Sequence, residues 1–348
     1  MTRCLRDMSL QELETLVGQF DSGPNRAKRL FSALAHCDIE RTRHLRKVAK
    51  SLRFALDEAG YYVSPLSLQQ VCISRQDPGT VKFLFFTRDG LPVESVLMPA
   101  MGGRSTLCVS SQVGCKMACS FCCTAQMGFL RHLSRGEIVT QFTKAFTFTK
   151  ACALPPITNI VFMGMGEPFD NFEAVMGAFD TFNHPLGYGI SRDRITISTV
   201  GHVDGLDSLA KRSIRTNIAL SLNAPSDDLR NEIMPINQRW PLADVIGALR
   251  RYPLRPGRVF VIEYVLIAGV NDSREHARAL EEILADLPCK INVIKYNPSP
   301  SLSYEAPTDE EVSAFASLLE NVGKGVLVRR SRGADIAAAC GQLGSKRR

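Results

Sequence analysis

The feature that most constrains the fold is a repeated alternation of strand-like and helix-like segments from Ser105 onward. The strand-like runs, such as VFVIEYVLI, are almost continuously apolar, as in parallel strands that are covered by helices. Strand candidates are 106–111, 157–163, 194–199, 216–222, 259–267, 290–296 and 325–330, and helix candidates are 134–150, 171–182, 204–212, 241–251, 273–286 and 308–322. This repeat predicts an α/β fold with a barrel or partial barrel, whose site lies in the loops after the strands.

Two shorter regions precede the repeat. Residues 1–64 have leucines at helical spacing, and residues 65–104 change to alternating, β-branched sequence with an RDG turn. We therefore predict an N-terminal helical domain (1–64), a small β-hairpin region (65–104), a barrel (105–343) and a short basic tail (344–348).

Positive charge is concentrated in the N-terminal helices. Residues 25–53 contain nine Lys or Arg residues and two acidic ones, while the formal net charge of the whole chain is +7. Basic helices neutralise phosphates and release counterions, so this segment predicts contact with nucleic acid. The simpler alternative is a solvated helix face.

The sequence also predicts a cytoplasmic protein. No apolar run approaches the ~20 residues of a membrane span. The first residues include Asp and Glu where a signal peptide would be apolar. Thiols stay reduced in the cytoplasm, so the eleven cysteines are expected to bind metal or do chemistry rather than form disulfides.

Four of these cysteines lie in the segment VGCKMACSFCCTAQ, directly after the first predicted strand. Cys115, Cys119 and Cys122 have the spacing CxxxCxxC, and Cys123 follows at once. A structural zinc site needs four closed ligands, usually in two CxxC pairs, and the sequence has no second pair. Three cysteines suit a [4Fe–4S] cluster in which one iron stays open to a small molecule. Zinc and inert thiols are the alternatives to this interpretation.

The loops after the later strands are rich in Gly, Pro, Asn and Glu. GMGEP (164–168) follows the second strand, TVG the third, NAP the fourth and NPSP the sixth. The carboxyl ends of parallel barrel strands lie on one rim, so these loops should surround a ligand together with the cysteines.

These motifs resemble known enzymes. CxxxCxΦC after the first strand and GMGEP after the second resemble the radical S-adenosylmethionine (SAM) superfamily. The segments LCVSSQVGCKMACSFCCTAQMGF, GMGEPFDN, ITISTVG, MPIN, GVNDS, EHA, PCKIN and RGADIAAACGQL together resemble the RlmN/Cfr family of RNA adenine methyltransferases, over about residues 10–343. The resemblance implies a TIM-like partial (β/α)6 barrel, a [4Fe–4S] cluster held by Cys115, Cys119 and Cys122, and two SAM molecules per turnover.

The resemblance also implies roles for single residues. Cys340 would accept a methyl group from one SAM, and the radical made from a second SAM would activate that methyl group for addition to adenine. Cys108 would resolve the protein–RNA thioether, and Glu94 would accept a proton. The residues implied in SAM binding are Gly166, Glu167, Ser198, Ser221, Leu222, Asn223 and Asn297. Asn223 stands where the family usually has His.

The motifs differ in which carbon of adenine they indicate as the methylation site. TAQMGF and PCKINVI resemble RlmN, whereas RITIST and GVNDSREHA resemble Cfr. We predict methylation of adenine C2 in the peptidyl-transferase centre of 23S rRNA, with adenine in the tRNA anticodon loop as a further substrate. The alternatives are Cfr-like methylation of C8 and a non-catalytic RNA-binding iron–sulfur protein. The resemblance further implies a monomer that receives electrons from a donor such as flavodoxin or ferredoxin.

Overall fold

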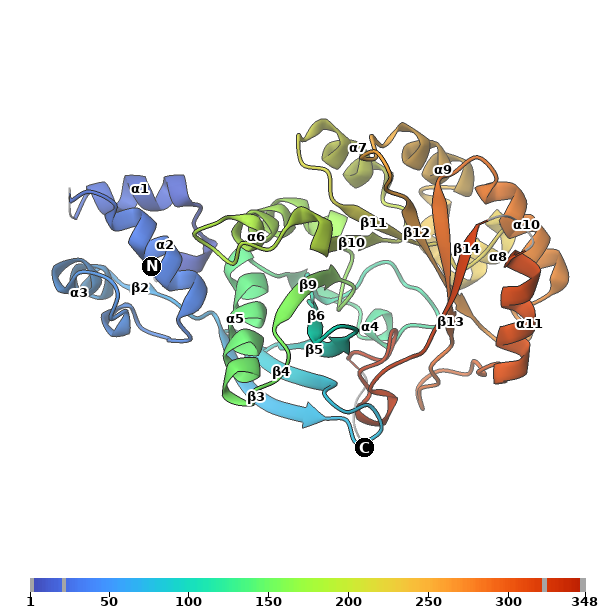
Figure 1. The fold of residues 1–348 in the computed structure, drawn as a ribbon, viewed down its shortest axis with the longest axis horizontal. Helices are drawn as coiled ribbons and strands as arrows, with labels where there is room; N and C mark the ends of the chain where they lie inside the picture. The colour runs from blue at the N-terminus through green and yellow to red at the C-terminus, as the bar shows by residue number, and fades with distance from the viewer. Residues whose placement is uncertain (1–2, 21–22, 321–323, 345–348) are drawn as a thin grey trace.

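The computed structural model describes residues 3–20, 23–320 and 324–344, and within them one ten-stranded sheet forms the centre of the molecule (Figure 1). The sheet order is β14-β13-β12-β11-β10-β9-β6-β5-β4-β3. Its strands are β3 (Leu66–Ile73), β4 (Val81–Thr87), β5 (Pro92–Ala100), β6 (Arg104–Cys108), β9 (Ile157–Phe162), β10 (Ile195–Thr199), β11 (Asn217–Ser221), β12 (Phe260–Leu266), β13 (Cys289–Lys295) and β14 (Gly325–Arg329). From β6 to β14 all neighbouring strands pair in parallel, which confirms the predicted partial barrel.

The three strands of the predicted hairpin region extend this sheet. β3, β4 and β5 pair antiparallel, and β5 pairs antiparallel with β6, where Val96 lies opposite Cys108. The antiparallel region is therefore hydrogen-bonded directly to the first barrel strand.

Helices follow the parallel strands, as the alternation predicted. They are α5 (Arg135–Ala151), α6 (Phe172–Asn183), α7 (Val203–Lys211), α8 (Asp227–Ile233), α9 (Leu242–Arg251), α10 (Arg274–Leu284) and α11 (Asp309–Glu320). α5 begins at a capping box, in which the Glu137 N–H donates to Ser134 Oγ and the Ser134 N–H donates to the Glu137 carboxylate. The short helix α8 was not predicted, and the last two residues of the predicted helix 308–322 lie outside the described residues.

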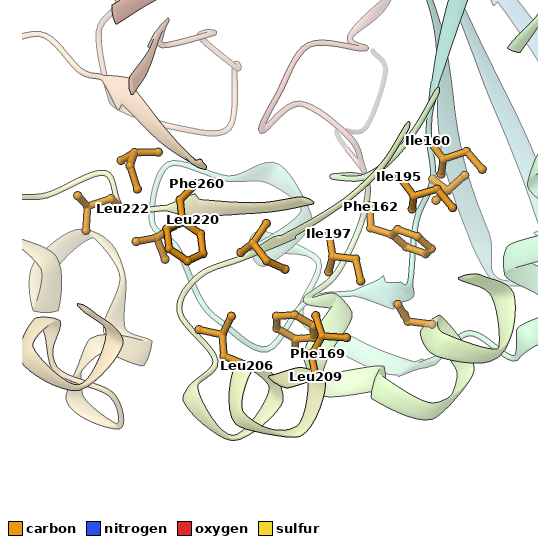
Figure 2. Close-up of a cluster of buried hydrophobic side chains, with 14 of the residues drawn as sticks. Ile160, Phe162, Phe169, Ile195, Ile197, Leu206, Leu209, Leu220, Leu222 and Phe260 are labelled. Atoms are coloured by element: carbon orange, nitrogen blue, oxygen red, sulfur yellow. The ribbon is translucent and has the colours of Figure 1, made fainter. Parts of the chain in front are cut away.

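Alternate residues of each barrel strand point to opposite faces. Ile160 and Phe162 of β9 and Ile195 and Ile197 of β10 form a buried core with the side chains of α7, as Figure 2 shows. The intervening positions of the same strands, Val161 and Ser198 among them, line a cavity on the other face. This alternation leaves the inner face of the barrel free to hold a site.

The N-terminal helices have a hydrophobic core of their own. They are α1 (Leu10–Gly18), α2 (Arg26–His36) and α3 (Lys50–Glu58). Their buried side chains include Leu13, Leu30 and Leu52. The N-terminal region contacts the barrel at α5, where Lys144 Nζ lies 2.7 Å from Oδ1 of Asp38 in the loop after α2. None of the helices in the described part of the chain has the length and apolar character to cross a membrane.

The first barrel strand is shorter than predicted. It ends at Cys108 rather than at Ser111, because the side chain of Gln141 on α5 replaces the strand pairing at Ser110. Gln141 Oε1 accepts the Ser110 N–H at 2.9 Å, and Gln141 Nε2 donates to the Ser110 carbonyl at 3.0 Å. The chain then forms a small unpredicted hairpin of β7 (Gln112–Gly114) and β8 (Phe129–His132) around the cysteine segment.

Candidate active site

A single cavity on the inner face of the barrel gathers most of the predicted site residues. The predicted residues that line it are Cys108, Cys115, Cys119, Cys122, Gly166, Glu167, Ser198, Ser221, Asn223 and Cys340. Three others, Glu94, Leu222 and Asn297, are not among the lining residues in the described chain. The cavity therefore joins the strand-end loops with a segment from the C-terminal end of the chain.

The β7–β8 hairpin shapes the cysteine loop. At Gly114, φ is +74° and a Cβ atom would lie 1.7 Å from the carbonyl oxygen of Gly128, so only glycine fits this approach. The next residue, Cys115, donates its N–H to the same carbonyl at 3.1 Å. Ala118 has a φ of 57°, in the left-handed region, and turns the chain between Cys115 and Cys119. The two thiols consequently reach the same cavity.

The structure places the last two cysteines of the loop differently. Cys122 lines the cavity and directly precedes the short helix α4 (Cys123–Gln126). Cys123 is 2% exposed, is not among the lining residues, and donates its N–H to the carbonyl of Gly341 at 2.7 Å. This placement supports Cys122 as the third ligand, although the assignment itself stays a prediction.

The three lining thiols of this loop fit a cationic cluster. Burial raises the pKa of Cys115 to about 12. The pKa of Cys119 is raised well above its ordinary value by burial and by the nearby Cys122 and Cys115. Three thiolates in one cavity thus need a positive partner. In the described residues no three His, Cys, Asp or Glu side chains converge on one metal-ion position, whereas a four-iron cluster offers each thiolate an iron of its own.

Arg230 places a fixed positive charge behind the cysteine loop. Its side chain is 0% exposed, and it donates to the carbonyl of Leu222 at 3.1 Å and to Asn237 Oδ1 at 2.7 Å. It also interacts favourably with Cys119 and offsets part of the rise in the pKa of that thiol. Because these hydrogen-bond partners are uncharged oxygens, they do not neutralise the buried guanidinium. An anionic neighbour, such as a thiolate or an anionic ligand, would therefore stabilise it. Leu222, itself fully buried, can offer a ligand only its backbone.

Glu167 is a buried carboxylate on the same wall. It accepts the N–H of Phe169 at 3.1 Å and that of Val200 at 3.0 Å. Burial raises its pKa to about 7, and these hydrogen bonds offset the shift only in part. Among the described residues no Lys, Arg or His forms an ion pair with it, so an amino group of a ligand would stabilise its ionised form. Beside it, Gly166 has a φ of +93°, and a Cβ there would lie 2.4 Å from Gln112 Cβ.

The ends of β10 and β11 supply polar groups at the next positions. Ser198 Oγ and Ser221 Oγ lie 3.4 Å apart. Asn223 has a φ of 59°, a conformation that Asn tolerates well, and its Oδ1 accepts the N–H of Val265 at 2.9 Å. Its Nδ2 contacts Met234 Sδ at 3.3 Å. The uncharged amide therefore links the loop after β11 to β12 as well as lining the cavity.

Two cysteines from distant parts of the chain meet across the cavity. Cys108 is the last residue of β6, and Cys340 lies in the loop after the 3-10 helix η6 (Ala334–Ile336). Burial raises the pKa of Cys108 to about 12, and the neighbouring Cys340 adds to the shift. Cys340 lines the cavity, and the residue as a whole is exposed although its thiol is largely removed from water.

The C-terminal segment is held in place by two of the predicted residues that do not line the cavity. Glu94 accepts the N–H of Gly344 at 2.7 Å and forms an ion pair of 2.9 Å with Lys82. Asn297 Nδ2 donates to the carbonyl of Cys340 at 3.3 Å. These contacts favour a positioning role for both side chains in this structure, and the assignments of Glu94 as proton acceptor and Asn297 as SAM contact stay predictions.

The sequence analysis missed three charged residues of the site. Arg230 lies on α8, Glu263 on β12 and Arg329 at the end of β14. The last two line the cavity. A glutamate in the otherwise apolar run VFVIEYVLI was a signal that could have pointed to Glu263.

Comparisons with known proteins agree with this geometry. The profile described as the radical SAM superfamily matches residues 109–280. A crystal structure of a radical SAM methyltransferase from Sphaerobacter thermophilus has a TM-score of 0.92 and 39% sequence identity and covers 98% of each chain. A dual-specificity RNA methyltransferase RlmN from Geobacter sulfurreducens is 42% identical, over 98% of this chain and 92% of its own. Another, from Anaeromyxobacter sp. strain Fw109-5, is 41% identical, over 98% and 90%.

The barrel, its cysteine loop and the superfamily match define a radical SAM enzyme, a class that uses a [4Fe–4S] cluster and SAM. The nearly full-length relatives narrow this class. The chain belongs to the RlmN family of radical SAM methyltransferases. The fold class and the family predicted from the sequence are thereby confirmed.

Proposed function

We propose that this protein methylates C2 of an adenine in the peptidyl-transferase centre of 23S rRNA and, as a second substrate, adenine in the tRNA anticodon loop. The observation that carries the proposal is that five cysteines from three parts of the chain line one cavity. They are Cys108, Cys115, Cys119, Cys122 and Cys340. A cluster with an open iron uses three of them, and two more suit a methyl carrier and its resolving partner. The description of the relatives as dual-specificity RNA methyltransferases supports an RNA substrate.

The chemistry explains why such a site needs a radical. An aromatic C–H bond has no useful acidity or nucleophilicity, so polar methyl transfer does not reach it. When bound, the cluster and SAM supply a carbon radical in the cavity. In our proposal Cys115, Cys119 and Cys122 hold the cluster, and Glu167 accepts hydrogen bonds from the amino group of SAM. Ser198, Ser221 and Asn223 lie on the same wall and would orient the rest of that molecule.

The two remaining cysteines divide the transfer between them. Cys340, exposed on a segment that Glu94 and Asn297 hold, is the methyl carrier, which takes its methyl group from one SAM while a second SAM provides the radical. In the proposal Cys108, which lines the same cavity at the end of β6, resolves the thioether between Cys340 and the RNA.

The N-terminal helices are proposed to bind the RNA backbone. Seven of the nine basic side chains in residues 25–53 are exposed: Lys28, Arg29, Arg41, Arg43, Arg46, Lys47 and Lys50. Phe54 is 40% exposed, with Lys50 Nζ 5.9 Å and Arg53 Cζ 5.7 Å from its ring centre. Exposed rings beside cations can stack on unpaired bases, and the cations neutralise phosphates. We further propose that the protein works as a cytoplasmic monomer with flavodoxin or ferredoxin as its electron donor.

Nucleoside mass spectrometry of rRNA and tRNA from a deletion strain tests the proposed function. The strain would be complemented with the natural chain, with Cys340→Ala, or with Cys152→Ala, a control at an exposed cysteine outside the cavity. We expect 2-methyladenosine to disappear in the deletion strain and to return with the natural chain and the control, but not with Cys340→Ala. Loss of 8-methyladenosine instead would establish the C8 alternative. Unchanged RNA would favour a non-catalytic RNA-binding protein.

A further inference from the structure

Two charged side chains line the cavity on the wall near Cys340, and the proposed reaction gives neither a role. Glu263 lies within the apolar strand β12 and is 6% exposed. Its Oε1 accepts from Asn292 Nδ2 at 3.1 Å, whereas its Oε2 has no hydrogen-bond partner in the described residues and lies 3.9 Å from Arg329 Nη1. The Glu263 side chain is 8% exposed and that of Arg329 is 32% exposed, so only the carboxylate is buried. A carboxylate that is removed from water in a cavity wall is costly unless a positive charge compensates it, and Arg329 supplies that charge.

We propose that Arg329, held by Glu263, is the positive charge that stabilises the thiolate of Cys340 when this sulfur accepts a methyl group. The inference rests on the proposed function, because it concerns the methyl carrier of that reaction. Arg329, Cys340 and Cys108 line the same cavity. The electrostatic interaction of Arg329 with both thiols is favourable, and Cys340 is the main reason why the pKa of Arg329 is raised. Arg329 is thus available to both of the cysteines that lie outside the cysteine loop.

The chemical step requires such a charge because the thiolate, not the thiol, is the nucleophile. The Cys340 thiol loses its proton to solvent in the cavity. The electron pair on Sγ forms a bond to the methyl carbon of a sulfonium donor. The carbon–sulfur bond of the donor breaks, and its electron pair stays on the donor sulfur, which becomes a neutral thioether. Arg329 raises the fraction of Cys340 that is ionised before the transfer.

The charges around the Cys340 thiol predict the direction in which each substitution shifts its pKa. Three sets of charged or titratable groups surround this part of the cavity. Arg329 on β14, Glu263 on β12 and Cys108 on β6 interact with Cys340. Lys290 on β13 interacts with Glu263, and the Lys82–Glu94 pair on β4 and β5 contacts the segment that carries Cys340. Removal of the thiol from water raises the pKa of Cys340, Glu263 raises it further, and Arg329 opposes both effects. Removing Arg329 or Glu263 should therefore shift the ionisation of Cys340 in opposite directions.

The pH dependence of Cys340 alkylation by iodoacetamide tests this directly. Cleavage by trypsin after Arg332 and Lys346 gives the peptide 333–346, in which Cys340 is the only cysteine. The unmethylated fraction of this peptide would be followed by mass spectrometry in the full-length protein, kept anaerobic. The variants are Arg329→Met, Arg329→Lys and Glu263→Gln, with Arg330→Met as the matched control at an exposed neighbouring arginine.

Arg329→Met should raise the midpoint of the alkylation profile by about one pH unit, which slows the reaction about ten-fold below the midpoint. Arg329→Lys should restore part of the effect, Glu263→Gln should lower the midpoint, and Arg330→Met should leave it unchanged. The alkylation rate of Cys289, on peptide 279–290, reports whether each variant is folded, because this thiol is buried in the folded protein. An unshifted midpoint in folded Arg329→Met, or shifts of the same sign in Arg329→Met and Glu263→Gln, would overturn the inference.

The same peptide separates this inference from the proposed function. A peptide 333–346 that is one methylene heavier after incubation with SAM reports methylation of Cys340 itself. If this product never forms in the cluster-containing natural protein, the proposed methyl carrier is wrong, and with it the use that we assign to Arg329. If the product forms but the midpoint of the Cys340 alkylation profile is the same with and without Arg329, the methyl carrier stands. Only the role of Arg329 in stabilising its thiolate is then wrong.

Discussion

Replacing Glu167 by Gln should make the stability of the protein less dependent on pH. Burial raises the pKa of Glu167 from 4.5 to about 7, so the folded state keeps this proton to a higher pH than the unfolded chain. The protonated carboxyl therefore contributes its full stabilisation below about pH 4.5, and this contribution is lost as the pH rises through 7. At 1.36 kcal/mol per pKa unit, the free energy of unfolding falls by about 2.5 kcal/mol between roughly pH 5 and pH 8 because of this group alone.

Urea unfolding of the cluster-free protein at these two pH values measures the effect. Gln cannot ionise, so Glu167→Gln should gain about 2.5 kcal/mol relative to the natural chain on going from pH 5 to pH 8. Glu281→Gln, at an exposed position of α10, is the control and should show the pH dependence of the natural chain. If the stability difference between Glu167→Gln and the natural chain is the same at both pH values, the reasoning about this buried carboxyl is refuted.

Three further predictions concern the loop and the C-terminal segment. Cys119→Ala should lose bound iron and Cys123→Ala should retain it, because Cys119 lines the cavity and Cys123 does not. Iron and sulfide analysis after anaerobic reconstitution measures this, and equal loss would contradict the assignment. Lys82→Met should cost about 1–3 kcal/mol and speed proteolysis of the C-terminal segment; an unchanged cleavage rate would argue against this anchor. Gly114→Ala should cost at least ~2 kcal/mol, visible as a lower Tm, and an unaltered Tm would disprove the close approach to Gly128.

The positions of Glu94 and Lys82 explain how the segment that carries Cys340 is kept ordered. The segment that carries Cys340 contains little regular structure apart from η6, so its own backbone hydrogen bonds cannot fix it. Lys82 Nζ donates to the carbonyl of Ala337 at 3.0 Å while its ion pair with Glu94 connects it to Gly344. Charge-assisted bonds from two strands of the sheet thereby hold this segment on both sides of Cys340.

Much of the site could be predicted because its motifs are short. CxxxCxxC and GMGEP lie within single loops, and the ends of parallel strands bring such loops to one rim whatever the details of packing. Residues such as Arg230 and Arg329 could not be identified in this way. Their roles depend on which groups surround them, and a lone arginine in a helix or at a strand end has the same sequence appearance when it lies on the surface.

The sequence alone determined the order of the barrel strands along the chain, most of the helices between them and the loop that holds Cys115, Cys119 and Cys122. These features follow from the period of the apolar residues and from spacing along the chain. The tertiary structure alone decided that Cys123 lies outside the cavity, that Glu94 holds the C-terminal segment, and that Arg329 and Glu263 stand beside Cys340. These are contacts between residues far apart in the chain. They arise only when the barrel folds and its last segment returns across β4 and β5, a path that no local pattern of residues encodes.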